Sequence, residues 1–312
     1  MLTKEILKYV GKELKDELLS YPQFSFAEEL RIRKDSPAMF YAGGSEFVLN
    51  TVASSECIRE LMLALSMHSL SVFTDDIKNG FFTVDCGIRI GVAGRAVCEH
   101  GQIRMLRDYT SLNIRFPQQL KGIHAAIYGQ LANEGNIPTT LIVSAPQHGK
   151  TTLLRDLIRA VSAGELYIPK KVCAVDERSE LAGSGYFDLG PRTDVLSACP
   201  KAEGMRMALR SLSPEVIATD EIGAEKDLEA LFEAGNCGVK VLATAHAGSV
   251  DELLERMFFR KLMASGFIER TVVLSESLGR GTVENVYAKD GTPLLKKPVL
   301  PVSQMQEEKH AV

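Results

Sequence analysis

A Gly-Lys-Thr triplet at residues 149–151 joins an apolar strand pattern to a helical pattern. Residues 139–143 are Thr-Thr-Leu-Ile-Val, and residues 153–158 repeat apolar side chains at helical spacing. A strand, a loop, this triplet and a helix in that order are typical of a P-loop, in which backbone N–H groups and the positive end of the helix surround phosphates. The pattern therefore predicts an α/β domain that binds a nucleotide.

The predicted phosphate loop supplies phosphate ligands and one metal ligand. Lys150 is expected to reach the β- and γ-phosphates, and the hydroxyl of Thr151 to bind Mg²⁺. ATP and Mg²⁺ are accordingly the predicted cofactors. The residues predicted to bind them in this loop are Ser144, Ala145, Pro146, Gln147, His148, Gly149, Lys150, Thr151 and Thr152.

Two positions depart from the glycine pattern of such loops. Ser144 stands where the first glycine belongs, and Gln147 stands where many P-loops have another. Because only glycine adopts a positive φ without cost, side chains at these positions are expected to strain a tight loop. Taken alone, the loop therefore also fits a helix start that binds no ligand.

A second strand pattern, Val216–Thr219, ends in two carboxylates, Asp220 and Glu221. Asp220 is expected to hold Mg²⁺ through water, and Glu221 to orient the attacking water and take its proton. By itself this pattern also fits a strand that ends in a solvated acidic turn. Its position downstream of the Gly-Lys-Thr triplet favours the nucleotide site.

Polar residues follow two further strand patterns. Glu177 comes just after the apolar residues 171–175, and Thr244 and His246 lie at the end of another apolar run. Open α/β sheets bind ligands at the carboxyl edge of their strands. Glu177 could therefore join Glu221 in activating water, while Thr244 and His246 could sense the γ-phosphate. The sequence leaves open which of the two glutamates is the main base, and whether His246 is only a structural residue.

The length of 312 residues predicts two domains. Residues 1–116 mix short strand and helix patterns, including a hairpin at Gly43-Gly44, and predict a smaller α+β domain. Residues 117–295 alternate buried strands with helices, which predicts a mainly parallel sheet covered on both faces. The strands expected there are 139–143, 171–175, 216–219, 240–244 and 271–274. Residues 296–312 are polar and aperiodic, and predict a disordered tail.

Charge and hydropathy argue against several classes of protein. The 36 Lys+Arg and 40 Asp+Glu give a net charge of −4, so the basic excess of a dedicated nucleic-acid binder is missing. No apolar run approaches the roughly 20 residues that cross a bilayer, and the N-terminus lacks the apolar core of a signal peptide. The six cysteines have neither disulfide nor metal-site spacing. We therefore expect a cytosolic protein with reduced, mostly buried cysteines that reaches membranes only through partners.

Several further segments, taken with these motifs, resemble the stage III sporulation protein AA family of endospore-forming bacteria, a branch of the secretion-type ATPases. The resembling segments are 91–96, 106–108, 111–115, 175–181, 190–195, 199–205, 210–217 and 220–223. The resemblance covers most of the chain. It implies a RecA-like P-loop domain that hydrolyses ATP.

The resemblance also implies residue roles and an assembly. An acidic box is centred on Asp176 and Glu177, and a histidine box ends at His246. Arg210 matches an arginine just before the second acidic strand, so the implied catalytic residues are Glu221, Glu177, His246 and Arg210. The implied assembly is a hexameric ring whose nucleotide lies between the two domains and beside a neighbouring subunit. Its implied setting is the mother-cell cytoplasm, at the forespore membrane through membrane-embedded channel proteins.

Two other functions remain open at this point. A chain of the same fold could be a scaffold that binds nucleotide poorly because its phosphate loop lacks glycines. A RecA-like nucleic-acid protein would instead use arginines of the first domain, although these alternate along strands and could equally meet phosphates or a protein partner. Such arginines are Arg31, Arg33, Arg89, Arg95, Arg104, Arg107 and Arg115.

Overall fold

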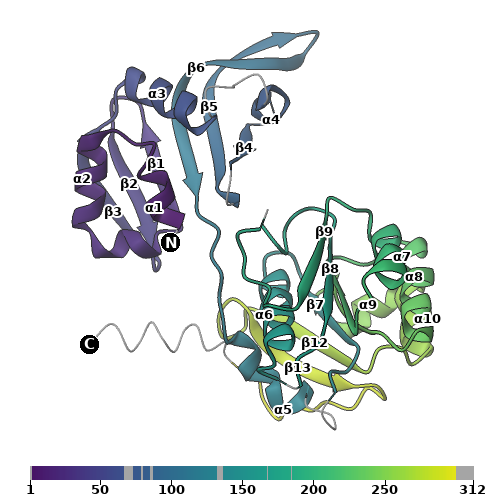
Figure 1. The fold of residues 1–312 in the computed structure, drawn as a ribbon. Helices are drawn as coiled ribbons and strands as arrows, with labels where there is room; N and C mark the ends of the chain where they lie inside the picture. The colour runs from purple at the N-terminus through teal and green to yellow at the C-terminus, as the bar shows by residue number, and fades with distance from the viewer. Residues whose placement is uncertain are drawn as a thin grey trace. The chain divides into compact units, whose positions relative to one another are not determined.

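The structure is a computed structural model that describes residues 2–66, 73–78, 80–84, 87–131, 136–166, 168–183 and 185–299. The chain divides into two compact units, Met1–Gln118 and Gln119–Val312. Figure 1 shows both units as ribbons.

Unit 1 is built on a six-stranded antiparallel sheet with the order β3-β2-β1-β6-β5-β4. The expected hairpin at Gly43-Gly44 is confirmed, since it joins β2 to β3 and both glycines have positive φ. Every second residue of β1 is buried, as expected for a sheet with one covered face. The strands are β1 Glu29–Arg33, β2 Pro37–Ala42, β3 Ser45–Val52, β4 Phe81–Thr83, β5 Arg89–Glu99 and β6 Gln102–Arg115.

Short helices complete unit 1 and make it the α+β unit that the sequence predicts. Helix α3 is capped by Ser54, whose hydroxyl accepts a hydrogen bond from the N–H of Cys57. Its apolar residues Ile58, Leu61, Met62 and Leu65 recur at helical spacing and are buried. The helices are α1 Leu2–Ile6, α2 Lys12–Ser20, the 3-10 helix η1 Pro22–Phe26, α3 Ser55–Leu65 and α4 Thr74–Lys78.

Unit 2 contains a seven-stranded sheet with the order β13-β12-β7-β11-β10-β8-β9. Every neighbouring pair is parallel except β12 and β13, so the predicted mainly parallel sheet is confirmed. The strands are β7 Thr140–Ser144, β8 Val172–Asp176, β9 Thr193–Ser197, β10 Val216–Thr219, β11 Lys240–His246, β12 Arg270–Ser275 and β13 Thr282–Ala288.

Helices cover both faces of this sheet (Figure 1). One apolar cluster joins α6, η4 and α5 to alternate strand residues such as Ile142 and Ala218. The other joins α7, α8, α9 and α10 to the intervening residues, such as Val143 and Ile217. The helices are η4 Ile123–Ile127, α5 Tyr128–Leu131, α6 Lys150–Ala163, α7 Lys201–Ser211, α8 Glu225–Asn236, α9 Val250–Glu255 and α10 Met257–Ala264.

Each of the five strands expected in unit 2 is present, with ends that differ by no more than two residues. The sequence did not reveal β9 and β13. Strand β9 lies at the sheet edge and is largely exposed, so it lacks an apolar run. The predicted disordered tail starts at residue 296, but Val299 exchanges two backbone hydrogen bonds with Val283. Residues 300–312 lie outside the described residues.

Two other expectations concern the cysteines and membrane segments. The described cysteines are all free, as expected, but only Cys173 among them is buried, so the prediction of mostly buried cysteines is wrong. Cys86 lies outside the described residues. Among the helices that the structure describes, none combines the length and apolarity that a bilayer span requires.

Candidate nucleotide site

The predicted site residues meet at one edge of the unit 2 sheet. Strands β7, β11, β10 and β8 are neighbours and parallel, so their carboxyl ends lie along the same edge. The phosphate loop follows β7, the acidic pair follows β10, His246 ends β11, and Glu177 follows β8. The sheet topology therefore brings together segments that are far apart in the sequence.

The phosphate loop connects the end of β7 to the first residue of α6, Lys150. Gly149 caps this helix with φ 89°, and Gln147 has φ 66°, in the left-handed region. Ser144 differs from our expectation: it is a fully buried residue of β7, paired in register with His246, and has no positive φ. Only one of the two departures from glycine therefore places a side chain on strained backbone.

The two predicted magnesium ligands contact each other. The hydroxyl of Thr151 donates a hydrogen bond of 2.9 Å to Oδ2 of Asp220. The hydroxyl of Thr244 donates to Oδ1 of the same carboxylate. This contact links the phosphate loop to the acidic pair 69 residues downstream.

The chemistry of these donors fits Mg²⁺, which prefers oxygen ligands and keeps several waters. The described residues contain no group of three or more Asp, Glu, His or Cys side chains that could hold a metal alone. Phosphate oxygens and water would therefore have to complete the ligand set. Burial and the charges of Asp220 and Glu221 raise the pKa of Glu180, which shows that carboxylates crowd this pocket. A divalent cation would relieve that crowding.

Lys150 is buried, with only 5% of its surface exposed. Burial lowers the pKa of its ammonium, and the nearby carboxylates of Glu221, Asp220 and Glu180 partly offset that effect. Lys150 is therefore not a solvated side chain. A buried ammonium favours an anionic partner, which bound phosphates would supply.

Glu221 is held by the side chains of His246 and Arg178. Its Oε1 lies 2.5 Å from Nε2 of His246, and Nη1 of Arg178 donates to its Oε2 at 2.8 Å. Burial opposes ionisation of Glu221, but the hydrogen bond and charge of His246 and the charges of Arg178 and Lys150 prevail and lower its pKa. Its backbone N–H donates to Thr244, and its φ of 51° is left-handed. Glu221 is therefore an ionised, fixed carboxylate.

Glu177 lines the same pocket as Glu221 but has a different partner. The ammonium of Lys201 lies 2.6 Å from Oε2 of Glu177, and this hydrogen bond lowers the pKa of the glutamate. The residues that line the pocket are Asp176, Glu177, Arg178, Glu180, Lys201, Asp220 and Glu221. Both candidate bases therefore face one pocket, each engaged by a cation.

Asp176 has a supporting position within this acidic box. Its buried carboxylate accepts hydrogen bonds of 2.8 Å from the backbone N–H groups of Glu180 and Ala182. The guanidinium of Arg155 stacks on the ring of Phe187 and donates to the carbonyls of residues 180 and 181. These contacts fix the loop that carries Glu177 and Arg178.

Arg210 does not join the other predicted catalytic residues in this chain. It is exposed in the last turn of α7, whose first residue, Lys201, lies at the site. With a rise of about 1.5 Å per residue, the helix carries Arg210 away from the acidic pocket. Arg210 lines a second pocket with Arg206, Leu209, Glu233, Asn236 and Cys237.

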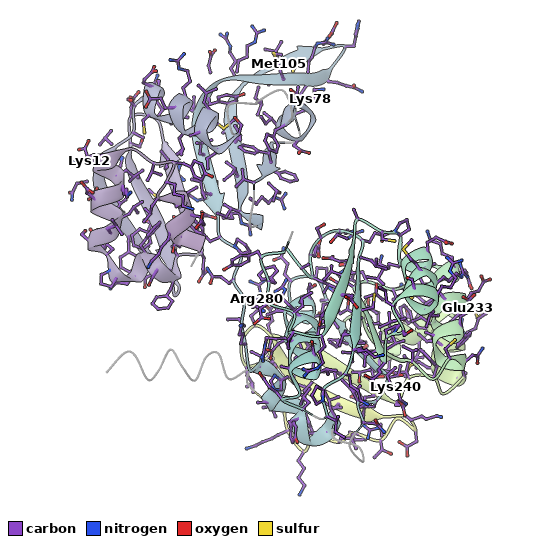
Figure 2. The ribbon with its side chains drawn as sticks, viewed as in Figure 1. Lys12, Lys78, Met105, Glu233, Lys240 and Arg280 are labelled. Carbon is purple, nitrogen blue, oxygen red and sulfur yellow. The ribbon has the colours of Figure 1, made fainter. Side chains whose placement is uncertain are left out.

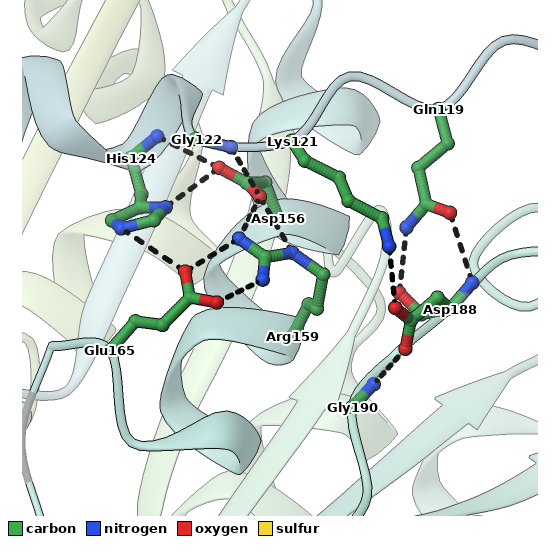
Figure 3. Close-up of polar contacts among 9 residues, drawn as sticks. All are labelled: Gln119, Lys121, Gly122, His124, Asp156, Arg159, Glu165, Asp188 and Gly190. Carbon is green, nitrogen blue, oxygen red and sulfur yellow. Dashed lines mark hydrogen bonds and ion pairs between the residues drawn. The ribbon is translucent and has the colours of Figure 1, made fainter.

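Helix α6 is also anchored along its middle and second half by a network of polar residues (Figure 3). The fully buried carboxylate of Asp156 accepts hydrogen bonds from the backbone N–H groups of Gly122 and His124, from Nδ1 of His124, and from Arg159. Burial would raise the pKa of Asp156, but these hydrogen bonds lower it to about 2. Arg159 in turn pairs with Glu165. The network fixes the helix that begins at Lys150.

Sequence reasoning missed several residues of the site. Arg178 and Lys201 lie within or beside recognised motifs, but a charge near a motif does not reveal its partner. Arg280 gave no sequence signal at all. Its Nε donates a 2.6 Å hydrogen bond to the carbonyl of Gln147, 133 residues away. Glu276, which lies with Arg280 in the turn between β12 and β13, has its Oε1 3.8 Å from Nε2 of His148.

Comparisons with known proteins agree on family and fold. A family model described as "Sporulation stage III, protein AA" matches residues 3–294. Stage III sporulation protein AA of Bacillus subtilis is 39% identical over 297 residues, which span 93% of this chain and 96% of the relative.

Two solved structures share the fold at low sequence identity. The Legionella pneumophila ATPase DotB has a TM-score of 0.56 and 18% identity, over 84% of this chain and 75% of that chain. The pilus retraction motor PilT with bound ADP has a TM-score of 0.54 and 14% identity, over 94% and 87%. Unit 2 therefore has the RecA-like P-loop fold of secretion ATPases.

Proposed function

The chain belongs to the sporulation stage III protein AA family, and from this premise we propose that it binds and hydrolyses ATP as a subunit of a secretion-type assembly in endospore formation. The observation that carries the proposal is the 2.9 Å hydrogen bond between Thr151 and Asp220. It joins a phosphate loop to an acidic strand end, as a Mg-nucleotide site requires. The buried Lys150 beside them supplies a cation for the phosphates.

The residues of the phosphate loop would bind the phosphates of ATP. Backbone N–H groups of the loop and of the first turn of α6 point toward bound anions, and the positive end of the helix adds to this attraction. Lys150 would neutralise charge on the β- and γ-phosphates. Thr151 and Asp220 would hold Mg²⁺, which would neutralise phosphate charge when bound.

Glu221 would orient the attacking water and accept its proton. In the structure both of its oxygens are engaged, one by His246 and one by Arg178. Each carboxylate oxygen can accept a second hydrogen bond, so Glu221 can receive one from the attacking water while both contacts persist. We infer that His246 and Arg178 orient the base and keep it ionised, and that Glu177 is the alternative base.

The assembly is a proposal that rests on the family. We propose a homo-oligomeric ring of six subunits, by analogy with secretion motors. It would lie in the mother cell and reach the forespore membrane through membrane-embedded partners. Arg210 is exposed on α7 and would be available to a neighbouring subunit. We propose two domains, residues 1–116 and 117–295. Hydrolysis of the nucleotide would drive movement between them.

A scaffold that binds nucleotide weakly is the second candidate. The observation in its favour is Gln147, a side-chain-bearing residue at φ 66° where many P-loops have glycine. Under this alternative the ring and its contacts would persist without turnover. The acidic pair and Lys150 would then have only electrostatic roles in the fold.

Three proteins test hydrolysis: the natural chain, Glu221→Gln and Glu177→Gln, each assayed for phosphate release and for MgATP binding. The natural chain is expected to turn over ATP. Glu221→Gln should bind MgATP but lose about 10²–10⁴-fold in rate, because the amide cannot take a proton. MgATP binding without turnover in the natural chain would favour the scaffold. A larger loss in Glu177→Gln would reverse the assignment of the base.

A further inference from the structure

The turn between β12 and β13 lies against the phosphate loop. Nε of Arg280 donates a 2.6 Å hydrogen bond to the carbonyl oxygen of Gln147. A Cβ atom added to Gly149 would lie 3.5 Å from Cα of Gly281, so the two backbones approach closely. Both contacts lie within unit 2, and Figure 2 labels Arg280 there. The turn thus meets the loop both through a side chain and through its backbone.

Hydrogen bonds within the turn fix the backbone that carries Arg280. The N–H of Gly281 donates to the carbonyl of Ser275, and the N–H of Gly279 donates to that of Glu276. The fully buried hydroxyl of Thr282 donates to the carbonyl of Gly279 at 2.6 Å. Arg280 therefore extends from a turn whose ends belong to the antiparallel pair of β12 and β13.

Arg280 contacts Gln147, which has a side chain where many P-loops have glycine. Gln147 also has a positive φ. Glycine adopts the left-handed region freely, whereas a residue with a side chain pays a conformational cost there. Such a conformation persists when surrounding contacts fix it. In this loop the carbonyl of Gln147 itself accepts the bond from Arg280, so the contact fixes the peptide that follows the strained residue.

We propose that Arg280 is a positioning residue that holds Gln147, and with it the phosphate loop, in the conformation that receives phosphates. This inference rests on the proposed nucleotide function. The contact would stabilise at Gln147 the positive φ that glycine adopts without cost in other P-loops. Arg280 would act through the backbone of Gln147 and would not touch the phosphates.

A double-mutant cycle tests this role, with Arg280→Ala, Gln147→Gly and the combined variant measured for MgADP affinity by calorimetry. Arg280→Ala should weaken MgADP binding about tenfold in the natural loop, which corresponds to about 1.4 kcal/mol. In the Gln147→Gly background the same change should cost no more than about twofold, because glycine needs no such support. Arg280→Lys should restore part of the affinity, since an ammonium can also donate to a carbonyl. Leu278→Ala, an exposed position of the same turn, should leave affinity unchanged.

An equal loss of affinity in both backgrounds would mean that Arg280 contacts the nucleotide directly, and it would overturn the positioning role. No loss in either background would overturn it as well.

Hydrogen exchange in the ligand-free protein separates this inference from the proposed function. Arg280→Ala should speed exchange of the amides of residues 147–149 when residue 147 is Gln, and much less when it is Gly. If the natural chain binds no MgADP, the nucleotide function fails while this measurement still decides the role of Arg280. Unchanged exchange in Arg280→Ala would overturn the inference whatever the nucleotide result.

Discussion

Nε2 of His246 lies 2.5 Å from Oε1 of Glu221, so the histidine at the end of β11 contacts the carboxylate that follows β10. The sequence suggested that His246 senses the γ-phosphate, whereas in this structure it is a partner of the proposed base. The contact with Glu221 is observed, whereas phosphate sensing by His246 stays a prediction.

The pairing predicts how the pH dependence of hydrolysis changes in His246→Ala. The hydrogen bond and charge of His246 help to lower the pKa of Glu221, so the pKa should rise toward its ordinary value in the variant. Because the base must be deprotonated, the acid limb of the rate profile should move to higher pH. His246→Gln, which keeps a hydrogen-bond donor without the charge, should show a smaller shift. An unmoved acid limb in His246→Ala would argue that Glu221 is not the group that titrates.

The hydroxyl of Thr151 is predicted to be required for magnesium binding. Thr151→Val keeps the shape of the side chain but removes the donor to Asp220 and the proposed metal ligand. The Mg²⁺ concentration that gives half-maximal ATP hydrolysis should rise by about tenfold or more, the equivalent of one lost contact of about 1.4 kcal/mol. Thr151→Ser should behave like the natural chain. Equal magnesium requirements for the Val and Ser variants would remove Thr151 from the metal site.

Ser144→Gly is predicted to bring no gain in nucleotide affinity. We expected strain at this position from the motif, but Ser144 is a buried, extended residue of β7. Glycine in a strand interior destabilises by roughly 0.5–1 kcal/mol, so thermal unfolding should occur at a lower temperature. Calorimetric titration with MgADP checks the affinity. Tighter binding would show that the loop needs glycine at its first position after all.

Asp156 is predicted to stabilise unit 2 in a pH-dependent way. Its pKa is lowered from 3.8 to about 2 in the folded chain, so its contribution is present above about pH 4 and is lost as the pH falls toward 2. A shift of this size corresponds to about 2 kcal/mol. Denaturant unfolding should therefore show Asp156→Asn less stable by at least about this amount at neutral pH, with a difference that shrinks in acid.

Asp188→Asn is the control for this measurement. Asp188 forms a half-exposed ion pair with Lys121, in which N and O lie 2.6 Å apart, and such pairs contribute roughly 0–1 kcal/mol. Figure 3 shows both carboxylates in the same part of the unit. If the two variants lost equal stability, the buried network around α6 would not have the anchoring role inferred for it.

Local patterns predicted much of the fold and of the site. Val216–Thr219 was found as a strand because its four residues are apolar or β-branched, and it is buried throughout. The contact between Thr151 and Asp220 followed from the roles of two motifs, each of which is local in sequence. Such features are predictable because neighbouring residues determine them.

Other features depend on the packing of distant segments and had no local signal. The motif could not tell that Gln147, and not Ser144, has the positive φ, because loop closure decides the backbone angles. The contact of Arg280 with Gln147 depends on how the β12–β13 turn meets the loop. Arg210 matched a family pattern, but α7 places it outside the acidic pocket.

The most direct test of the nucleotide site is the equilibrium binding of MgATP to the natural chain and to Lys150→Ala, with hydrolysis measured on the same samples. Lys171→Ala is the matched control, because Lys171 is exposed and precedes β8, at the opposite edge of the sheet. We predict that the natural chain and Lys171→Ala bind and hydrolyse MgATP alike, whereas Lys150→Ala loses both and still unfolds cooperatively. Unchanged MgATP affinity in Lys150→Ala would contradict the assignment of residues 144–151 as a phosphate loop.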